Sequence, residues 1–282
     1  MVLPMAAAAL ALVDRARYPI DEPSSEAFAA VVAEARRSLA EVGYAELPGF
    51  ITQEGVTALS SEAEELAGRA FASGGVGTAY LELPDEVAFD ETHPHRHWMP
   101  YSVSVVSYDL HPLDSGLRAV YESDELLGLL EAILERGPLF RYADPFGALN
   151  LAVMGDGDEL QWHFDQTDFV VSLAVRDADV GGDFEVAPKT RSADEENYEH
   201  VASILGGDDT DVVHVEMTPG TLLVFEGRNS LHRVSPIEGP TSRLVSLLAF
   251  DTEPDRVGSE LLRAIRYGRT EPFATPPVTW PL

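Results

Sequence analysis

The sequence predicts a mainly β protein with flanking helices, and three observations support this fold class. After Pro138 the chain contains short runs rich in β-branched and aromatic residues, each bounded by Gly, Pro or Asp. Regularly spaced short strands of this kind are typical of an all-β sandwich or barrel. The first half instead carries apolar residues at helical spacing. Apolar residues make up 45% of the 282 residues, which is enough for one sizeable core.

The N-terminal part is expected to be helical, with one short strand. The apolar run 3–13 predicts a helix that packs on the domain, because it is too short to span a bilayer and has no basic residues before it. Residues 24–43 predict an amphipathic helix with a Ser-rich start and Gly43 at its end. A short strand follows at 44–50, and a second amphipathic helix at 52–71.

The middle of the chain predicts a long connection and then the β core. Residues 73–100 have the composition of a loop, and it stays open whether they form a lid. Residues 102–108 predict a strand that joins the sheet, and 116–135 a helix that Gly137 stops. The expected core strands are 148–154, 160–165, 169–175, 182–187, 212–217, 221–225, 231–235 and 243–250.

Two further segments complete the expected organisation. The polar excursion 188–210 lies inside the β core and is expected to be partly helical, and 255–282 predicts a helix followed by a Pro-rich tail. We expect one structural domain overall, made of an N-terminal helical region with strands joining the core (1–137), a catalytic β core (138–252) and a C-terminal helix and tail (253–282).

Charge and cysteine content exclude several classes of function. Nineteen Lys and Arg against 48 Asp and Glu give a net charge of −29, which repels nucleic acid and anionic membranes. The chain has no cysteine, so disulfides and zinc–thiolate sites are excluded, and any metal must bind His, Asp or Glu. We expect a cytoplasmic protein that acts on a small molecule.

The stretch LQWHFDQTDF contains the strongest candidate metal ligands. On a strand, His163 and Asp165 point to the same face because they are two residues apart. A third ligand from another strand, with His200, His214 and His232 as candidates, would complete the two-His, one-carboxylate triad of non-haem Fe(II) oxygenases. His232 lies in NSLHRVSP, directly before the turn PIEGPT, whereas His214 is expected to be structural and His200 solvated.

Arg243 is the candidate for binding a carboxylate at the same site. It lies eleven residues after His232 and opens the apolar run LVSLLAF, where a charge is unusual unless it faces a polar pocket. A cosubstrate such as 2-oxoglutarate chelates iron with its keto-acid end and needs a cation for the far carboxylate. The planar fork of arginine binds a carboxylate with two parallel hydrogen bonds.

These residues lie in motifs that resemble a known family. GDGDELQWHFD, GGDFEVAP and PGTLLVFEGRNSLHRVSPIEGPTSR are similar to the Fe(II)/2-oxoglutarate-dependent dioxygenases, especially the bacterial group of amino-acid hydroxylases and halogenases, over about residues 145–250. The resemblance implies a double-stranded β-helix core (jelly-roll, cupin-like), O2 as oxidant, iron on His163, Asp165 and His232, and Arg243 on the C5 carboxylate of 2-oxoglutarate. Where much of the superfamily has a serine, this chain has Val245, so Thr241 or Ser246 is the candidate second partner of that carboxylate.

The resemblance also bears on the reaction. The related halogenases replace the carboxylate ligand by a small residue that leaves room for chloride, whereas this chain keeps Asp165. Hydroxylation of a small, polar, amino-acid-like substrate is therefore expected. The alternatives are desaturation or cyclisation of a natural-product precursor, a cupin-like metal protein without 2-oxoglutarate, and a non-catalytic β-sandwich binding module.

Other polar and aromatic residues are candidates for contacts with substrate or cosubstrate. The run THPHRHWMPY (92–101) is either a rival metal site or a segment that faces the substrate. Trp162 either packs in the core or lines the pocket. Gln166 and Asp168 either line the mouth of the pocket or cap the next strand. The Asn150 amide either contacts one of the two ligands, 2-oxoglutarate or substrate, or caps a turn. The substrate-facing candidates of the run are Arg96, His97, Trp98 and Tyr101.

Overall fold

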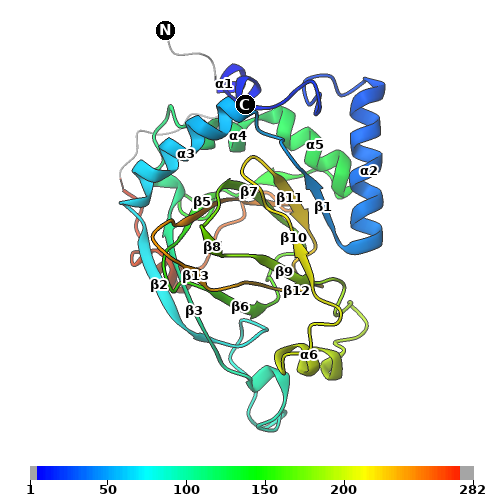
Figure 1. Cartoon of the computed structure of the whole chain (residues 1–282), viewed down its shortest axis with the longest axis vertical. Coiled ribbons are helices and arrows are strands. Elements are labelled where there is room, and N and C mark those ends of the chain that lie inside the picture. Colours follow the sequence, from blue (N-terminus) through cyan, green and yellow to red (C-terminus); the bar gives the residue numbers. More distant parts are fainter. Residues whose placement is uncertain (1–4, 274–282) are drawn as a thin grey trace.

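Two antiparallel β-sheets form the centre of the molecule, with most helices packed outside the larger sheet (Figure 1). A computed structural model describes residues 5–273, apart from the side chains of residues 5–7. The larger sheet has seven strands in the order β1-β11-β7-β14-β5-β3-β2, and the smaller has four in the order β10-β9-β12-β6. Two-stranded pairs β13-β8 and β15-β4 lie beside them. The predicted mainly β fold with flanking helices and a jelly-roll core is confirmed.

The strands are short, as their sequence pattern predicts. Their bounds are β1 (Tyr44–Leu47), β2 (Phe71–Gly77), β3 (Met99–Val106), β4 (Phe140–Arg141), β5 (Leu149–Met154), β6 (Leu160–His163), β7 (Val170–Arg176), β8 (Val180–Gly181), β9 (Phe184–Ala187), β10 (Val213–Val215), β11 (Leu222–Phe225), β12 (Leu231–Val234), β13 (Ile237–Glu238), β14 (Arg243–Leu248) and β15 (Phe250–Asp251).

The helices lie mainly before and after this core. Their bounds are α1 (Met5–Leu12), α2 (Glu26–Val42), α3 (Gln53–Ala67), α4 (Gly116–Glu122), α5 (Asp124–Leu134), α6 (Tyr198–Leu205) and α7 (Glu260–Tyr267), with single 3₁₀ turns at η1 (Pro94–Arg96) and η2 (Tyr108–Leu110). Within residues 5–273, no helix combines the length and apolarity that crossing a membrane requires.

The two faces of the larger sheet bury different sets of side chains. Leu149 and Leu151 of β5 point outward into a core shared with α2 to α5, whereas Ala152 and Met154 point inward, towards the smaller sheet. This alternation follows from the two-residue period of a strand. A side chain on the inward face can therefore reach the space between the sheets, and one on the outward face cannot.

Strands from the N-terminal region complete both edges of the larger sheet. β1 pairs with β11 at one edge, while β3 pairs with β5 and carries β2 at the other. The expected strand at 102–108 thus joins the sheet, although it spans Met99–Val106. The expectation of a loop from residue 73 is wrong for 73–77, because β2 continues to Gly77. Its sequence FASGGVG lacks the β-branched alternation that marks a strand.

Several helix boundaries follow the predicted capping residues. The Ser25 hydroxyl accepts a hydrogen bond from the Phe28 backbone at 3.0 Å and caps α2, and Gly43 ends that helix with φ 75°. The single helix expected over 116–135 is wrong: α4 ends at Glu122, and Ser123 begins α5 by accepting from the Leu126 backbone at 3.2 Å. An N-capping serine within a periodic run can thus divide it into two helices.

The C-terminal helix packs against the edge of the larger sheet. α7 occupies part of the predicted 255–282 helix and tail, of which 274–282 lie outside the described residues. The Ser73 hydroxyl of β2 donates to the Ile265 carbonyl at 3.1 Å, and the Tyr267 hydroxyl donates to Asn150 Oδ1 at 2.8 Å. These bonds attach α7 to β2 and to the inward face of β5.

Candidate metal centre

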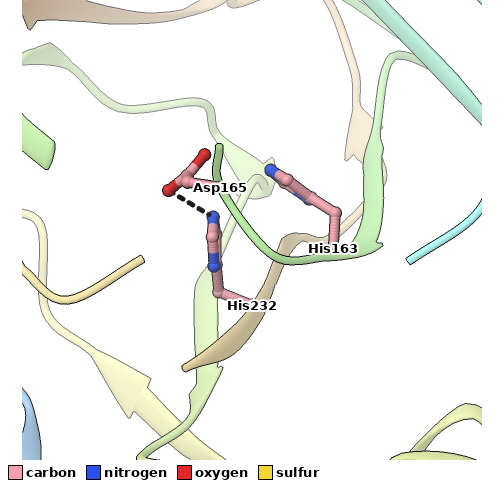
Figure 2. A group of neighbouring side chains, drawn as sticks. All are labelled: His163, Asp165 and His232. Atoms are coloured by element: carbon pink, nitrogen blue, oxygen red, sulfur yellow. Dashed lines mark ion pairs between the residues drawn. The ribbon is translucent and has the colours of Figure 1, made fainter. Parts of the chain in front are cut away.

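Two neighbouring strands of the smaller sheet bring the predicted ligands together (Figure 2). His163 ends β6 and His232 lies on β12, where the two are register partners with ring centroids 4.2 Å apart. Asp165 lies just beyond the end of β6, and its backbone N–H donates to the Gly227 carbonyl at 3.0 Å. The expected strand 160–165 is therefore shorter than predicted, but the Asp165 side chain still turns towards both imidazoles.

The three side chains could hold one metal ion. One ligand atom from each lies within 4.8 Å of the others, and Nε2 of His232 is 3.4 Å from Oδ2 of Asp165. No other group of three such residues exists within the described part of the chain. The other candidate third ligands lie elsewhere, because His200 pairs with Asp211 at 3.3 Å and His214 with Glu185 at 3.6 Å.

Backbone carbonyls orient both imidazoles. Nδ1 of His163 lies 2.7 Å from the Gln161 carbonyl, and Nδ1 of His232 lies 2.9 Å from the Ser230 carbonyl. A carbonyl can only accept, so each Nδ1 carries the hydrogen and each Nε2 is left as a metal ligand. Burial, followed by the nearby His232, lowers the pKa of His163 to about 4, which keeps this imidazole neutral.

The Asp165 carboxylate fits a metal ligand, because within residues 5–273 no hydrogen-bond donor reaches its buried oxygen. Oδ2 is buried and accepts no hydrogen bond from the described residues. With its hydrogen on Nδ1, the imidazole of His232 turns Nε2 towards this oxygen, an arrangement in which a metal cation between the two atoms would be bound by both. Gly227 makes the approach possible, since a Cβ there would overlap Oδ2 and lie 2.8 Å from Cγ of Asp165.

Arg243 is a buried cation on the inward face of the larger sheet. It opens β14 on the inward face, opposite Met154, and is 6% exposed. Its guanidinium makes no hydrogen bond or ion pair with residues 5–273, and burial lowers its pKa to about 10 although Asp177 and Asp183 act in the opposite direction. Leaving a buried arginine unpaired is costly, which favours an anionic ligand as its missing partner.

The other residues expected to bind cosubstrate have different contacts. Ser246 lies on the outward face of β14 with Leu244 and Leu248, away from the Arg243 side chain. Thr241 donates its hydroxyl to Asp179 at 2.6 Å in an exposed turn. Asn150 donates to the Phe146 carbonyl at 2.7 Å and accepts from Tyr267, so both ends of its amide are engaged. Thr241 and Asn150 are therefore engaged elsewhere, whereas Ser246 Oγ has no hydrogen-bond partner among the described residues and is kept from Arg243 by lying on the opposite face of β14.

The candidates near the metal ligands have mainly structural contacts. Trp162 is buried with the Arg233 guanidinium 4.8 Å from its ring centroid. The two oxygens of Asp168 bond to Arg136 at 3.0 Å and Arg228 at 2.6 Å. Gln166 donates to the Tyr80 carbonyl at 3.3 Å, which ties the segment between β2 and β3 to the ligand-bearing turn.

The 92–101 run is divided between packing and exposure. His93 and His95 stack with Phe89 and meet Tyr198 edge-on, so they form an aromatic cluster and no metal site. Arg96 donates to the Phe89 carbonyl at 3.2 Å, also within this cluster.

The remaining substrate-facing candidates of this run lie apart. His97 and Trp98 are exposed, and the Tyr101 ring lies along Gly75 and Gly77 of β2. Phe164 lies between the candidate ligands His163 and Asp165. Its backbone N–H donates to the Ala79 carbonyl at 2.7 Å. The segment before η1 therefore lies directly beside the metal centre.

Sequence reasoning missed the residues that position the site. In the sequence, Gly227 is only the glycine of FEGR. The sequence does not show that the Asp165 side chain occupies the space that a Cβ at this position would fill. The carbonyls of Gln161 and Ser230 cannot be identified from side-chain chemistry. Gly182 is similar, because a Cβ there would lie 2.9 Å from Cδ of Arg243.

The sequence and the structure each match known proteins. The profile of the family described as HalD, Halogenase D, matches residues 28–261. An oxidoreductase of the 2OG-Fe(II) oxygenase family from Burkholderia pseudomallei is similar in structure, with a TM-score of 0.51 and 14% identity over 79% of this chain and 91% of that one. No curated protein matches the sequence.

Two further solved structures are similar. AviO1 from Streptomyces viridochromogenes Tue57 has a TM-score of 0.52 and 20% identity over 79% of this chain and 95% of that one. The epimerase SnoN, in complex with Fe3+, alpha ketoglutarate and nogalamycin RO, has a TM-score of 0.54 and 14% identity, with 79% of this chain and 84% of that chain covered. At these identities the likeness shows the fold.

Proposed function

Because the chain belongs to the Halogenase D family and folds as the 2OG-Fe(II) oxygenases do, we propose that it is an Fe(II)- and 2-oxoglutarate-dependent dioxygenase. In the proposed reaction it hydroxylates an unactivated C–H bond of a small, polar, amino-acid-like substrate, with succinate and carbon dioxide as coproducts. The observation that carries the proposal is the convergence of His163, Asp165 and His232 on one point.

The residues for the two cofactors lie on different sheets, with the candidate iron ligands on the smaller sheet and its turn and Arg243 on the larger sheet. His163, Asp165 and His232 would hold Fe(II) on one face and leave positions for a chelating cosubstrate and dioxygen. Arg243 would bind the far carboxylate of 2-oxoglutarate through parallel hydrogen bonds. Bound together, Fe(II) and 2-oxoglutarate supply the activation of dioxygen. The protein supplies orientation through the Gln161 and Ser230 carbonyls.

Asp165 supports hydroxylation within a family named for halogenation. A halide ligand needs an open coordination position, and in this chain the carboxylate of Asp165 faces that position beside His232. The close fit of this side chain over Gly227 leaves little room for it to swing away. The retained carboxylate therefore favours the transfer of hydroxyl to the substrate.

The chain organisation supports a single catalytic domain. We propose that residues 1–137, 138–252 and 253–282 form one structural domain overall. β1 and the β2–β3 pair from the first part complete both edges of the larger sheet, and α7 from the last part is hydrogen-bonded to β2 and β5.

A substrate panel tests the reaction directly. Amino acids are incubated with the protein, Fe(II), 2-oxoglutarate and oxygen, and the products are measured by mass spectrometry. We expect one amino acid to gain one oxygen atom with a matching amount of succinate, and His232→Ala to give neither. Loss of two hydrogens would show desaturation or cyclisation, and gain of chlorine would show halogenation; either outcome contradicts hydroxylation.

The Arg243 side chain separates this proposal from a cupin-like metal protein that uses no cosubstrate. A protein of that kind has no need of a buried cation at the start of β14. Arg243→Ala should abolish succinate formation while metal binding persists. Metal-dependent activity that is independent of 2-oxoglutarate and unchanged in Arg243→Ala would support the cupin-like alternative.

A further inference from the structure

A layer of side chains supports the candidate metal ligands from the far face of the smaller sheet. Phe164 directly follows His163, and Leu231 directly precedes the other histidine ligand, so both side chains point away from the metal face. Both are buried in one apolar cluster with Val201 of α6. A change in this layer can therefore shift the ligands that lie in front of it.

Arg191 is the charged residue of this layer, and its side chain is only 15% exposed. Its guanidinium carbon lies 4.1 Å from the centroid of the Phe164 ring and 5.5 Å from that of the Tyr80 ring. Nε donates to the Arg228 carbonyl at 2.7 Å, and Nη1 pairs with Glu196 at 3.0 Å. One guanidinium thus stacks on one turn and bonds to another.

These two turns meet at Asp165. One of them contains Phe164, whose backbone leads directly into the carboxylate ligand. The other contains Gly227, whose carbonyl accepts from the Asp165 N–H at 3.0 Å and whose lack of a Cβ leaves room for Oδ2. Arg191 bonds to the residue that follows Gly227. It therefore joins the two sides of the contact that places the carboxylate.

The residues just before Arg191 support the second histidine ligand. The Lys189 backbone donates to the Ser230 hydroxyl at 3.1 Å, and the Leu231 backbone donates to the Thr190 hydroxyl at 3.3 Å. The carbonyl of Ser230 orients the ring of His232. The start of the polar excursion 188–210 is thus bonded to both ligand-bearing segments.

Arg263 of α7 has contacts of the same kinds elsewhere in the molecule. Its side chain is 17% exposed, it pairs with Asp144 at 3.2 Å, and its guanidinium carbon lies 5.3 Å from the centroid of the Phe146 ring. Among the described residues, its side-chain hydrogen bonds go only to Asp144. Arg263 therefore shows what such an arginine does where no metal ligand is involved.

We propose that Arg191 is a positioning residue of the metal centre, which holds the Phe164 turn against the Gly227 turn so that Asp165 is in place for the metal. The proposal rests on the proposed function and deepens it. Arginine suits this role because its planar guanidinium stacks on an aromatic ring and donates in the plane at the same time. Groups that orient metal ligands contribute to metal affinity without touching the metal.

The test measures Co(II) binding to the full chain in the absence of oxygen. The variants are Arg191→Met, Arg191→Lys and the matched control Arg263→Met. Calorimetry gives the affinity for Co(II), the visible bands of bound Co(II) report its coordination geometry, and urea unfolding gives the stability of each metal-free variant.

Both methionine variants should lose stability, because each removes an ion pair and a stacked cation. Arg191→Met should bind Co(II) about 10–100-fold more weakly than the wild type, with altered visible bands at saturation. Arg191→Lys should fall between them, because it keeps the charge over the ring but cannot reach the Arg228 carbonyl and Glu196 at once. Arg263→Met should match the wild type in both affinity and bands.

Two results would overturn the proposal: Arg191→Met binds Co(II) with wild-type affinity and bands, or Arg263→Met loses as much affinity as Arg191→Met, which would make the effect one of general stability. If Arg191→Met does not fold, Arg191→Lys decides, and wild-type affinity in that variant would overturn the proposal. Failure of the proposed function differs, because the wild type itself would then bind no Co(II).

Discussion

Gly227→Ala should disable the metal centre without touching a ligand. A Cβ at this position would lie 2.8 Å from Cγ and 3.0 Å from Cβ of Asp165 and would overlap Oδ2. Ordinary contacts between such atoms begin above 3 Å, so the carboxylate must move by about 1 Å. Metal ligands must keep their distances within about 0.2 Å, so Asp165 could no longer coordinate in place.

The expected magnitude follows from the loss of one well-placed ligand. Changes in the groups that orient metal ligands typically cost about 10–100-fold in metal affinity, and displacement of the ligand itself should reach the upper end of this range. The backbone at Gly227 does not have a positive φ, so alanine is strained there only by its contact with Asp165. The fold should therefore persist.

Anaerobic calorimetric titration with Fe(II), or with Co(II) as a substitute, measures the effect. Gly128→Ala is the matched control, because nothing lies within 4 Å of a Cβ at this position in α5, and alanine there should stabilise the helix by up to about 1 kcal/mol. Metal affinity should fall in Gly227→Ala and stay unchanged in Gly128→Ala. Equal affinity in both variants would refute the reasoning.

Three further predictions concern charge at and near the site. Arg243→Met should raise the free energy of unfolding of the cofactor-free protein by about 1–3 kcal/mol, because it removes a buried unpaired charge. In urea titrations, 2-oxoglutarate should no longer stabilise this variant, and a variant that it still stabilises would contradict the assignment. Asp165→Gly should replace hydroxylation by chlorination when chloride is present, as mass spectrometry would show, and an iron-bound variant without chlorinated product would show that opening the position is insufficient. Burial lowers the pKa of both His111 and His163 to about 4. Because the unfolded chain takes up these protons near pH 6.5, the metal-free protein should lose about 2 kcal/mol per histidine between pH 7 and 5, and His111→Leu should lose less. Equal losses in that variant and the wild type would contradict the role of His111.

Sequence patterns predicted those parts of the fold that depend on interactions between residues close together in the chain. Gly43 ends α2 as expected, and Ser25 caps it, because both act through their own backbone geometry. β2 was missed because its sequence has no side-chain pattern typical of a strand. Its pairing with β3 makes it one. The break at Ser123 was missed because a serine within a helical period can also point to solvent.

The same contrast holds at the site. His163 and Asp165 were predicted from their two-residue spacing on a strand. His232 was predicted from the resemblance of its motif to a known family. The structure brings the three side chains together. The contacts of Asp168 were not predictable, because its arginine partners lie 32 and 60 residues away in sequence.

The central claim is that one Fe(II) ion and one 2-oxoglutarate bind together at His163, Asp165, His232 and Arg243. Anaerobic visible spectroscopy tests this most directly, because 2-oxoglutarate chelated to Fe(II) gives a weak charge-transfer band that neither gives alone. The wild type should develop the band at one iron per chain, Arg243→Met should need far more 2-oxoglutarate, and His232→Ala should show none. A wild type without the band, or a band that persists in His232→Ala, would contradict the account.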